Sequence, residues 1–335
     1  MTAALRVVAP GLLTTLQDLG RVGHQHLGVP VSGALDHVSL RAANLLVGNP
    51  PDMAALEIAY QGPTLVVEAD SARIALAGGQ APVEVLPPEG DGSAPRRLAC
   101  FESARLVCGQ RVRVGGLVGS AMLYLAVEGG FAVPPVLGSR STYALGALGG
   151  HEGRKLEAGD LLPVGKVDSV AKEGRSVPGE LRRALTMPAE LRVVPGLYWH
   201  RITEASGEHF FDDEWKVALE ADRIGYRFKG GRTLEFIPRT PPFGAGSDPS
   251  NIVDACYPYG SIQVPGGSEP IVLHRDAVSG GGYCMIGTVI CADMDLIGQL
   301  QPHTPTRFVK TDLEAALAAR HERAALLEQV RSTLR

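Results

Sequence analysis

The stretch 17–49 concentrates the residue types that could bind and activate a substrate. Asp18, Arg21, Ser32 and Asp36 all lie beside glycine-containing turns, where a rigid scaffold usually displays functional side chains. Backbone N–H groups at such turns, together with an arginine, can stabilise a developing oxyanion or hold a carboxylate. The alternative interpretation is a structural turn with solvated charges, and both interpretations stay open on these residues alone.

Four further loops combine glycine with Asp, Arg, Asn or Ser in the same way. They are 138–154, 222–227, 246–254 and 276–283. Each one taken singly is better explained as an ordinary turn of a β-rich protein. The five loops together, with one chemistry in common, predict a composite site.

Several common kinds of site are excluded. The sequence contains no GxxxxGK[ST] phosphate loop, no GxGxxG between a strand and a helix, no HExxH and no GxSxG. The five cysteines form no CxxC pair, and their odd number argues against a disulfide framework and a zinc site. His24 and His26 form an i, i+2 pair in a loop, but histidines so placed more often form hydrogen bonds than bind metal. We therefore expect reduced thiols and no metal.

Charge and hydropathy exclude other classes of partner. The net charge is −4 over 335 residues, so no electrostatic argument favours nucleic acid or an anionic membrane. The longest apolar run, 114–127, is interrupted by glycines and is too short to span a bilayer. The N-terminus lacks the pattern of a secretory signal peptide. A cytoplasmic location is the expectation.

The elements that must position these loops are expected to be mainly strands. The chain has 41 Gly and 24 Pro but only 2 Trp, which favours many short strands joined by turns. Helical patterns occur at three places, namely from Asp36 to Gly48, at about 212–219, and from Thr311 to the C-terminus. Thr311 and Glu314 match a capping box that would begin the last helix.

A division into two halves is indicated by a charged, weakly patterned stretch at 167–185. Residues 4–12 are echoed by 190–197, which makes two related β-rich halves plausible. The expected parts are an N-terminal half at 1–185, a C-terminal half at 186–311 and a helical tail at 312–335. The tail is expected to dock on the protein or on a second copy.

Ordered motifs through almost the whole chain resemble the biotin-dependent carboxyltransferase family. This family was once called allophanate hydrolase subunit 2, and it includes the KipA antikinase, the C subunit of bacterial 5-oxoprolinase and the second part of the urea carboxylase carboxyltransferase domain. The matching segments are 17–21 (QDLGR), 28–36 (GVPVSGALD), 43–49 (ANLLVGN), 138–142 (GSRST), 222–227 (DRIGYR) and 282–290 (GYCMIGTVI). The resemblance implies cyclophilin-like β-barrel domains with a few short helices and a C-terminal helix.

Two loops carry information about the subtype. KipA and 5-oxoprolinase members usually read DRQTTGGY where this chain has DAVSGGGY at 276–283. The segment 246–254 (GSDPSNIVD) is instead similar to the SHPSNIHD segment of urea carboxylases. The resemblance therefore implies a urea-carboxylase-like carboxyltransferase subunit. The alternatives are the C subunit of an ATP-dependent 5-oxoprolinase, which is a lactam hydrolase, and a KipA-like regulatory binding protein.

The resemblance also implies site residues. An arginine and backbone donors would stabilise the ureido oxygen of biotin and hold the carboxylate, beside an amide-type substrate. The catalytic candidates are Arg21, Arg140, Arg223 and Asp276. The candidates for substrate binding are Asp18, Ser32, Asp36, Tyr226, Asp248, Asn251, Asp254, Ser279 and Tyr283.

Cofactors and partners follow from the same resemblance. The chain has no Met-Lys dipeptide, so the usual biotin attachment motif is absent and carboxybiotin would arrive on a separate carrier protein. ATP would be used by a partner subunit. The expected partner is a homologous first-half subunit, of the allophanate hydrolase subunit 1 or KipI type. Further partners would be a biotin carrier with a biotin carboxylase, or a LamB/YcsF-type subunit.

Overall fold

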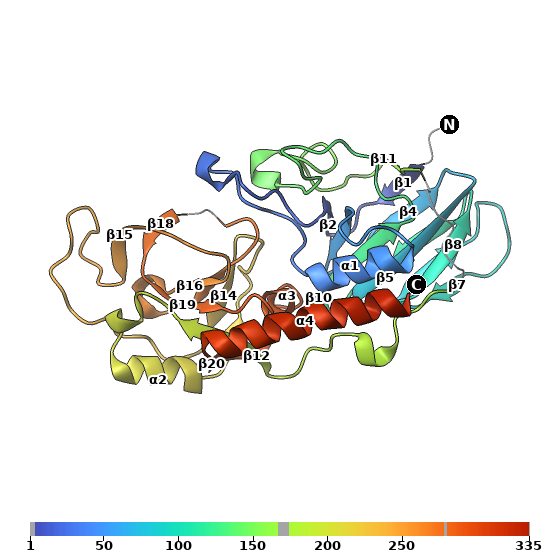
Figure 1. The fold of residues 1–335 in the computed structure, drawn as a ribbon. Helices are drawn as coiled ribbons and strands as arrows, with labels where there is room; N and C mark the ends of the chain where they lie inside the picture. Colours follow the sequence, from blue (N-terminus) through green and yellow to red (C-terminus); the bar gives the residue numbers. More distant parts are fainter. Residues whose placement is uncertain (1–3, 167–173, 278–279, 335) are drawn as a thin grey trace. The chain divides into compact units, whose positions relative to one another are not determined.

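The computed structural model describes residues 4–166, 174–277 and 280–334. The chain divides into two compact units (Figure 1). The N-terminal unit comprises Met1–Arg21, Ser32–Arg183 and Ala325–Arg335, and the C-terminal unit comprises Val22–Val31 and Ala184–Ala324. The segment 22–31 thus leaves the QDLGR motif of the first unit and belongs to the second. Of the charged stretch at 167–185, residues 167–173 lie outside the described part of the chain.

Two antiparallel sheets build the described N-terminal unit. The first is a 6-stranded sheet in the order β11 (Leu161–Pro163), β1 (Ala4–Ala9), β4 (Thr64–Val67), β9 (Arg111–Val114), β6 (Val83–Leu86) and β7 (Arg96–Leu98). The second is a 5-stranded sheet in the order β2 (Leu13–Gln17), β3 (Ala55–Ala59), β10 (Val118–Val127), β5 (Ser71–Gln80) and β8 (Ser103–Val107). The long central strand β10 is almost wholly buried, so this sheet carries much of the core.

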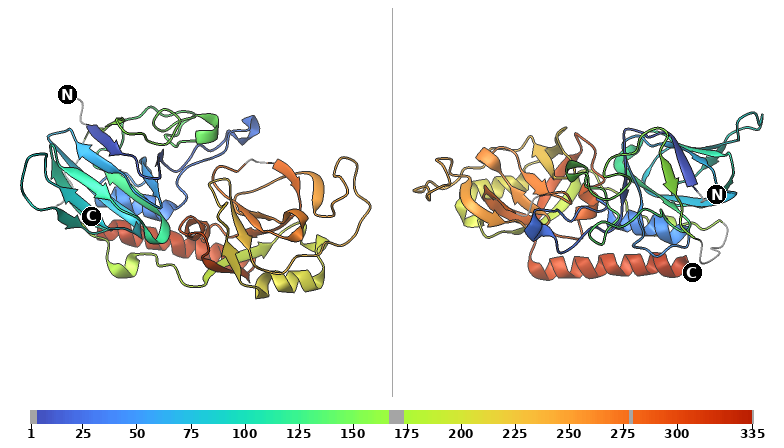
Figure 2. Two further views of the ribbon diagram at one scale, coloured as in Figure 1. Left: turned by 180° about the vertical axis from the view of Figure 1, so that it is seen from behind. Right: turned by 90° about the horizontal axis from the view of Figure 1, so that it is seen from above.

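Helix α1 (His37–Leu46) covers the second sheet and packs on β5 and β10 (Figures 1 and 2). The sequence defines both of its ends. Asp36 caps the N-terminus by accepting a hydrogen bond from the N–H of Ser39 at 3.0 Å. Gly48, with φ of 83°, follows the last turn in the left-handed conformation that glycine tolerates.

A closed barrel forms the described C-terminal unit. Its strand order is β12 (Ala189–Pro195), β19 (Met285–Val289), β16 (Ser261–Gln263), β17 (Ile271–Leu273), β14 (Gly225–Lys229), β13 (Trp215–Val217) and β20 (Pro305–Lys310). The parallel pairing of β12 with β20 closes it. Aromatic rings fill one end, where Phe210 stacks on Phe308 with centroids 4.6 Å apart. A small separate sheet pairs β15 (Asn251–Cys256) with β18 (Gly280–Tyr283).

Three further helices and five 3-10 turns complete the described chain. They are α2 (Glu204–Asp212), α3 (Met294–Ile297) and α4 (Leu313–Thr333), with 3-10 turns η1 (Gln25–Leu27), η2 (Ala144–Gly146), η3 (Gly179–Leu181), η4 (Trp199–Arg201) and η5 (Pro265–Gly267). None of the helices in the described ranges is both long enough and apolar enough to cross a membrane. The mainly-β fold with a C-terminal helix is confirmed.

Two local predictions are wrong. The helix expected at about 212–219 ends at Asp212, and Trp215 and Val217 belong to β13. Both side chains are buried while Lys216 between them is exposed, and this alternation is typical of a strand. The tail helix is capped by Asp312, which accepts a hydrogen bond from the N–H of Ala315 at 2.8 Å, instead of by Thr311.

Candidate functional site

Arg223 and Asp276 meet at one corner of the barrel. Gly225 at the start of β14 pairs with Leu273 at the end of β17, so the loops before β14 and after β17 lie together. Arg223 donates from Nε to Asp276 Oδ2 at 2.8 Å and from Nη2 to Oδ1 at 3.2 Å. The N–H of Asp276 donates to the carbonyl of Arg223 at 2.9 Å. Two sequence candidates are therefore partners in one mostly buried ion pair.

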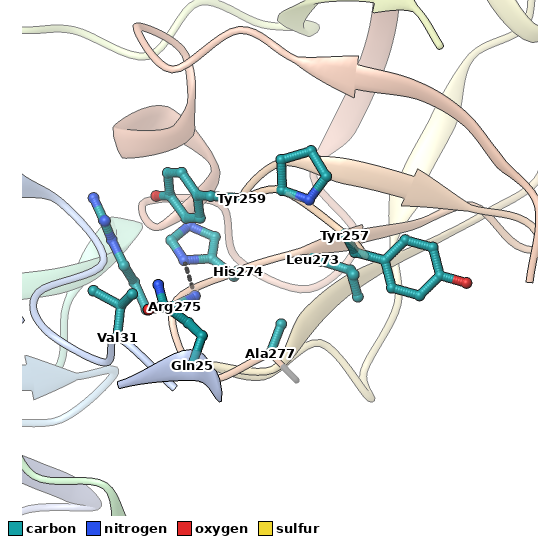
Figure 3. Close-up of a pocket in the computed structure, with 9 residues that line it drawn as sticks. Gln25, Val31, Tyr257, Tyr259, Leu273, His274, Arg275 and Ala277 are labelled. Atoms are coloured by element: carbon teal, nitrogen blue, oxygen red, sulfur yellow. Dashed lines mark hydrogen bonds between the residues drawn. The ribbon is translucent and has the colours of Figure 1, made fainter. Parts of the chain in front are cut away.

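A pocket of about 150 Å³ opens beside this ion pair, inside the C-terminal unit (Figure 3). Its polar lining comes from the loop after β17 and from the segment before β16, and Gln25 of η1 lies across from them. The Arg275 guanidinium lies 4.1 Å from the centroid of the Tyr259 ring, a distance typical of a cation–π contact. The pocket thus combines one guanidinium with aromatic walls, which suits a small planar molecule that carries or develops negative charge.

His274 fixes the backbone at the floor of this pocket. Its Nδ1 accepts a hydrogen bond from the N–H of Arg275 at 3.0 Å (dashed in Figure 3), and its Nε2 lies 3.2 Å from the carbonyl oxygen of Met294. The ring is therefore the neutral tautomer with the proton on Nε2. Burial holds the pKa of His274 well below its usual value, and the positive charges of Arg275 and Arg223 lower it further. With both nitrogens engaged, His274 orients Arg275 and does not act as a proton acceptor.

Tyr226, another candidate, belongs to the barrel core. Its side chain is buried, its ring centroid lies 5.6 Å from that of His274, and its hydroxyl lies 3.5 Å from the carbonyl oxygen of Gly298. It does not line the pocket. Tyr226 packs against His274 and can therefore support the pocket only through that residue.

Asp248, Asn251, Asp254 and Tyr283 lie in or directly beside the strands of the small β15–β18 sheet. Asp248 accepts from the N–H and the hydroxyl of Ser250 at 2.8 and 2.7 Å, and these two bonds lower the pKa of Asp248. Asn251 pairs with Tyr283 in the sheet, whereas Asp254 is exposed. Ser279 lies outside the described residues. None of these described side chains lines the Arg275 pocket.

A second cluster of candidates lies in the N-terminal unit, centred on the Asp18 carboxylate. It accepts hydrogen bonds from the hydroxyls of Ser139 and Ser141 at 2.6 and 2.5 Å and from the N–H of Arg140 at 2.5 Å. Arg21 is buried and donates to the carbonyl of Ser141. The loops that carry the QDLGR and GSRST motifs are thus joined to each other by these hydrogen bonds.

The last two candidates lie in the adjoining turn and are buried. Asp36 is the cap of α1, with its second oxygen accepting from the Ser39 hydroxyl at 2.5 Å. Ser32 has a φ of 54° and no exposed surface. The Glu57 carboxylate also holds this turn, because it accepts a hydrogen bond from the N–H of Leu35 at 2.7 Å. The turn is therefore rigidly built.

Sequence reasoning missed the residues that line the pocket. These are Gln25, Tyr257, Tyr259, His274 and Arg275. Two signals could have found some of them. His274 and Arg275 directly precede the candidate Asp276 and follow the short apolar run 271–273, and the run 257–260 places two tyrosines at a Pro-containing turn. Among the described residues, no group of three or more His, Cys, Asp and Glu side chains is placed to hold a metal ion.

Comparison with known proteins places the chain in a family. The family described as carboxyltransferase domain, subdomain A and B, matches residues 27–310. The C subunit of 5-oxoprolinase from Escherichia coli (strain K12) is 36% identical over 331 residues, which cover 97% of this chain and 97% of that protein. The urea amidolyase of Lachancea kluyveri is 32% identical over 340 residues, which cover 97% of this chain but 18% of that protein. The chain belongs to this carboxyltransferase domain family.

A solved structure agrees with this assignment. The urea carboxylase of Kluyveromyces lactis has a TM-score of 0.89 and 32% sequence identity, covering 100% of this chain and 30% of that one. One kind of relative is thus named as a subunit, and the other contains the matched region as one part of a longer chain. Components of two enzymes, 5-oxoprolinase and urea carboxylase, therefore share this fold.

Proposed function

We propose that this chain is the carboxyltransferase subunit of a biotin-dependent, urea-carboxylase-like system that acts on a small amide-type substrate. The observation that carries the proposal is the pocket at Arg275. Its volume of about 150 Å³ is below the roughly 300–1,000 Å³ of pockets for drug-sized ligands, and it suits a molecule of a few non-hydrogen atoms such as urea. The likeness of the whole chain to part of a urea carboxylase supports the same function.

The pocket residues divide the work. Arg275 would hold the oxygen on which negative charge develops, and the cation–π contact with the Tyr259 ring would help to keep its guanidinium in the pocket. His274 would keep the Arg275 backbone in place. The Arg223–Asp276 pair would brace the same loop from the other side. Carboxybiotin, when bound, supplies the carboxyl group, and the guanidinium in a small pocket fits that negatively charged group.

The proposed assembly contains other proteins that provide the biotin and use the ATP. Carboxybiotin would come on a separate carrier, and ATP would be consumed by a partner subunit. A homologous first-half subunit would be the direct partner. One relative is named as a subunit, and another carries this region within a longer chain. Both observations support the need for such partners.

The test is an assay with defined omissions. The purified chain is mixed with its candidate partner subunits, ATP, bicarbonate, a biotinylated carrier and one of urea, guanidine or 5-oxoproline, and phosphate release is measured. The proposal expects release to require the substrate, bicarbonate and the carrier. Release that needs neither carrier nor bicarbonate would overturn it.

The second candidate is the 5-oxoprolinase type, in which this chain would be the C subunit of an ATP-dependent lactam hydrolase. One observation favours it, because the Escherichia coli relative corresponds to this chain over 97% of both lengths. In the same assay it predicts phosphate release with 5-oxoproline in the absence of bicarbonate and carrier. A complex that forms with the partner but turns over none of the substrates would instead indicate a KipA-like regulatory role.

A further inference from the structure

The Arg275 pocket has two chemically different ends, both inside the C-terminal unit. Arg275 and the Tyr259 ring form the charged end. Leu273, Ala277 and the Tyr257 ring give the pocket an apolar lining, and Figure 3 shows the Tyr257 ring at the opposite end of the drawn residues from Arg275. A small molecule whose negatively charged group binds Arg275 would therefore extend along the apolar lining toward the Tyr257 ring.

The Tyr257 ring belongs to the core of the barrel as well as to the pocket. It packs in one apolar cluster with Ile271, Leu273 and Met285, and it is only 8% exposed. Close-packed cores accept added volume poorly, because neighbouring side chains have no empty space to move into. The ring is therefore a firm wall for any ligand in the pocket.

The hydroxyl of Tyr257 points away from the pocket and binds the backbone of strand β18 (Figure 3). It accepts a hydrogen bond from the N–H of Tyr283 at 2.9 Å, and its own proton can go to the carbonyl oxygen of Gly281 or of Tyr283, each 2.6 Å away. A Cβ on Gly281 would lie 3.0 Å from Cε2 of the ring, so the ring also packs directly on the β18 backbone. Strand β18 thus fixes the ring from the side away from the pocket.

We propose that the Tyr257 ring limits the length of the substrate in this pocket, and that β18 holds the ring in place through the tyrosine hydroxyl. The inference rests on the function proposed above and narrows its substrate class to small amides whose nitrogen carries no alkyl group. With the charged group at Arg275, an unsubstituted amide ends before the ring, whereas an N-alkyl group would have to displace the ring from the core. Tyr257 is then a specificity-determining residue that supplies neither charge nor proton to the reaction.

The test uses two matched probes, oxamate and N-ethyloxamate, on the full chain. Each carries a planar amide next to a carboxylate, and the second is longer by an ethyl group on the amide nitrogen. Isothermal titration calorimetry is expected to show oxamate binding about tenfold more tightly than N-ethyloxamate. Tyr257→Leu removes the ring but keeps an apolar side chain, and it should bring the two affinities close together. Equal binding by the parent, an unchanged preference in Tyr257→Leu, or no binding of oxamate up to about 10 mM would overturn the proposal.

A milder variant tests the role of β18. Tyr257→Phe keeps the ring and loses the hydroxyl, so the amide of Tyr283 should exchange its hydrogen about tenfold faster and the preference for oxamate should become smaller. Tyr198→Phe is the matched control, because Tyr198 packs against the same apolar cluster but does not line the pocket. Exchange at Tyr283 and a preference that both match the parent in Tyr257→Phe would show that β18 does not fix the ring.

These binding measurements need neither a biotin carrier nor ATP, so they separate this inference from the proposed function. A parent protein that prefers oxamate, but releases phosphate without carrier and bicarbonate, would contradict the carboxyltransferase function and leave the role of Tyr257 standing. Carrier-dependent turnover with no preference between the two probes would have the opposite meaning.

Discussion

Arg223 and Asp276 lock together the two loops that flank the entrance of β14 and the exit of β17. Their side chains share two hydrogen bonds of 2.8 and 3.2 Å, and their backbones share a third of 2.9 Å. The next residue toward the barrel from Asp276 is Arg275, which lines the pocket. The pair therefore holds the backbone directly next to Arg275, while its own two side chains bind each other.

Breaking this pair should destabilise the protein. Arg223→Ala leaves the Asp276 carboxylate mostly buried without its main partner, and we expect a loss of about 3–5 kcal/mol in the free energy of unfolding. The double variant Arg223→Leu and Asp276→Leu removes both charges and should recover most of that loss. Urea denaturation measures both. Arg307→Ala, at an exposed position of β20, should stay within about 0.5 kcal/mol of the parent. A stable Arg223→Ala protein would show that the pair is not a brace.

Arg275 should matter to turnover more than to stability. Arg275→Gln removes the charge that we expect to stabilise the developing oxyanion, and kcat/KM in the complete assay should fall about 10²–10³-fold. Arg275→Lys keeps a positive charge but loses the planar, multiply donating guanidinium that contacts the Tyr259 ring, so we expect only partial recovery. Arg307→Gln serves as the matched control. Full activity in Arg275→Gln would remove this residue from the site.

His274 should make stability depend on pH below neutrality. Its pKa is held well below 6.5 in the folded protein, so between that folded value and 6.5 the unfolded chain binds more protons. Stability should therefore fall as the pH drops below about 6.5, by up to about 1.4 kcal/mol per pH unit from this group. His274→Gln cannot titrate and should flatten the curve by that amount. Identical pH slopes for the two proteins in urea denaturation would rule out this origin.

Asp18 should control the order of the GSRST loop. Asp18→Asn weakens a charged acceptor that holds Ser139, Arg140 and Ser141, and we expect about 3 kcal/mol less stability. Amide hydrogen exchange should show faster exchange at 139–141. Asp52→Asn, at an exposed turn position, should leave exchange there unchanged. If 139–141 keep their protection in Asp18→Asn, the carboxylate is not what orders the loop.

Some elements could be predicted from the local sequence pattern, because the interactions that form them are between residues close together in the chain. The helix after Asp36 needed only a capping carboxylate, an apolar stripe and a glycine stop, and all three are in the sequence. The strand around Trp215 was predicted as helix because three residues are too few for periodicity to distinguish the two. Its place in the barrel came from pairing with β14 and β20, of which β20 is distant in sequence.

The sequence by itself determined that the chain is mainly β, that it carries the family motifs, and that polar side chains lie beside glycine turns. All three features depend on residues that are neighbours in the chain. It could not tell which polar groups bind one another. Asp18, Asp36 and Asp276 look alike in sequence, yet one orders a loop, one caps a helix and one pairs with Arg223. Only the tertiary structure brought His274, Arg275 and Tyr259 around one pocket, because strand pairing across the barrel places segments together that no local rule connects.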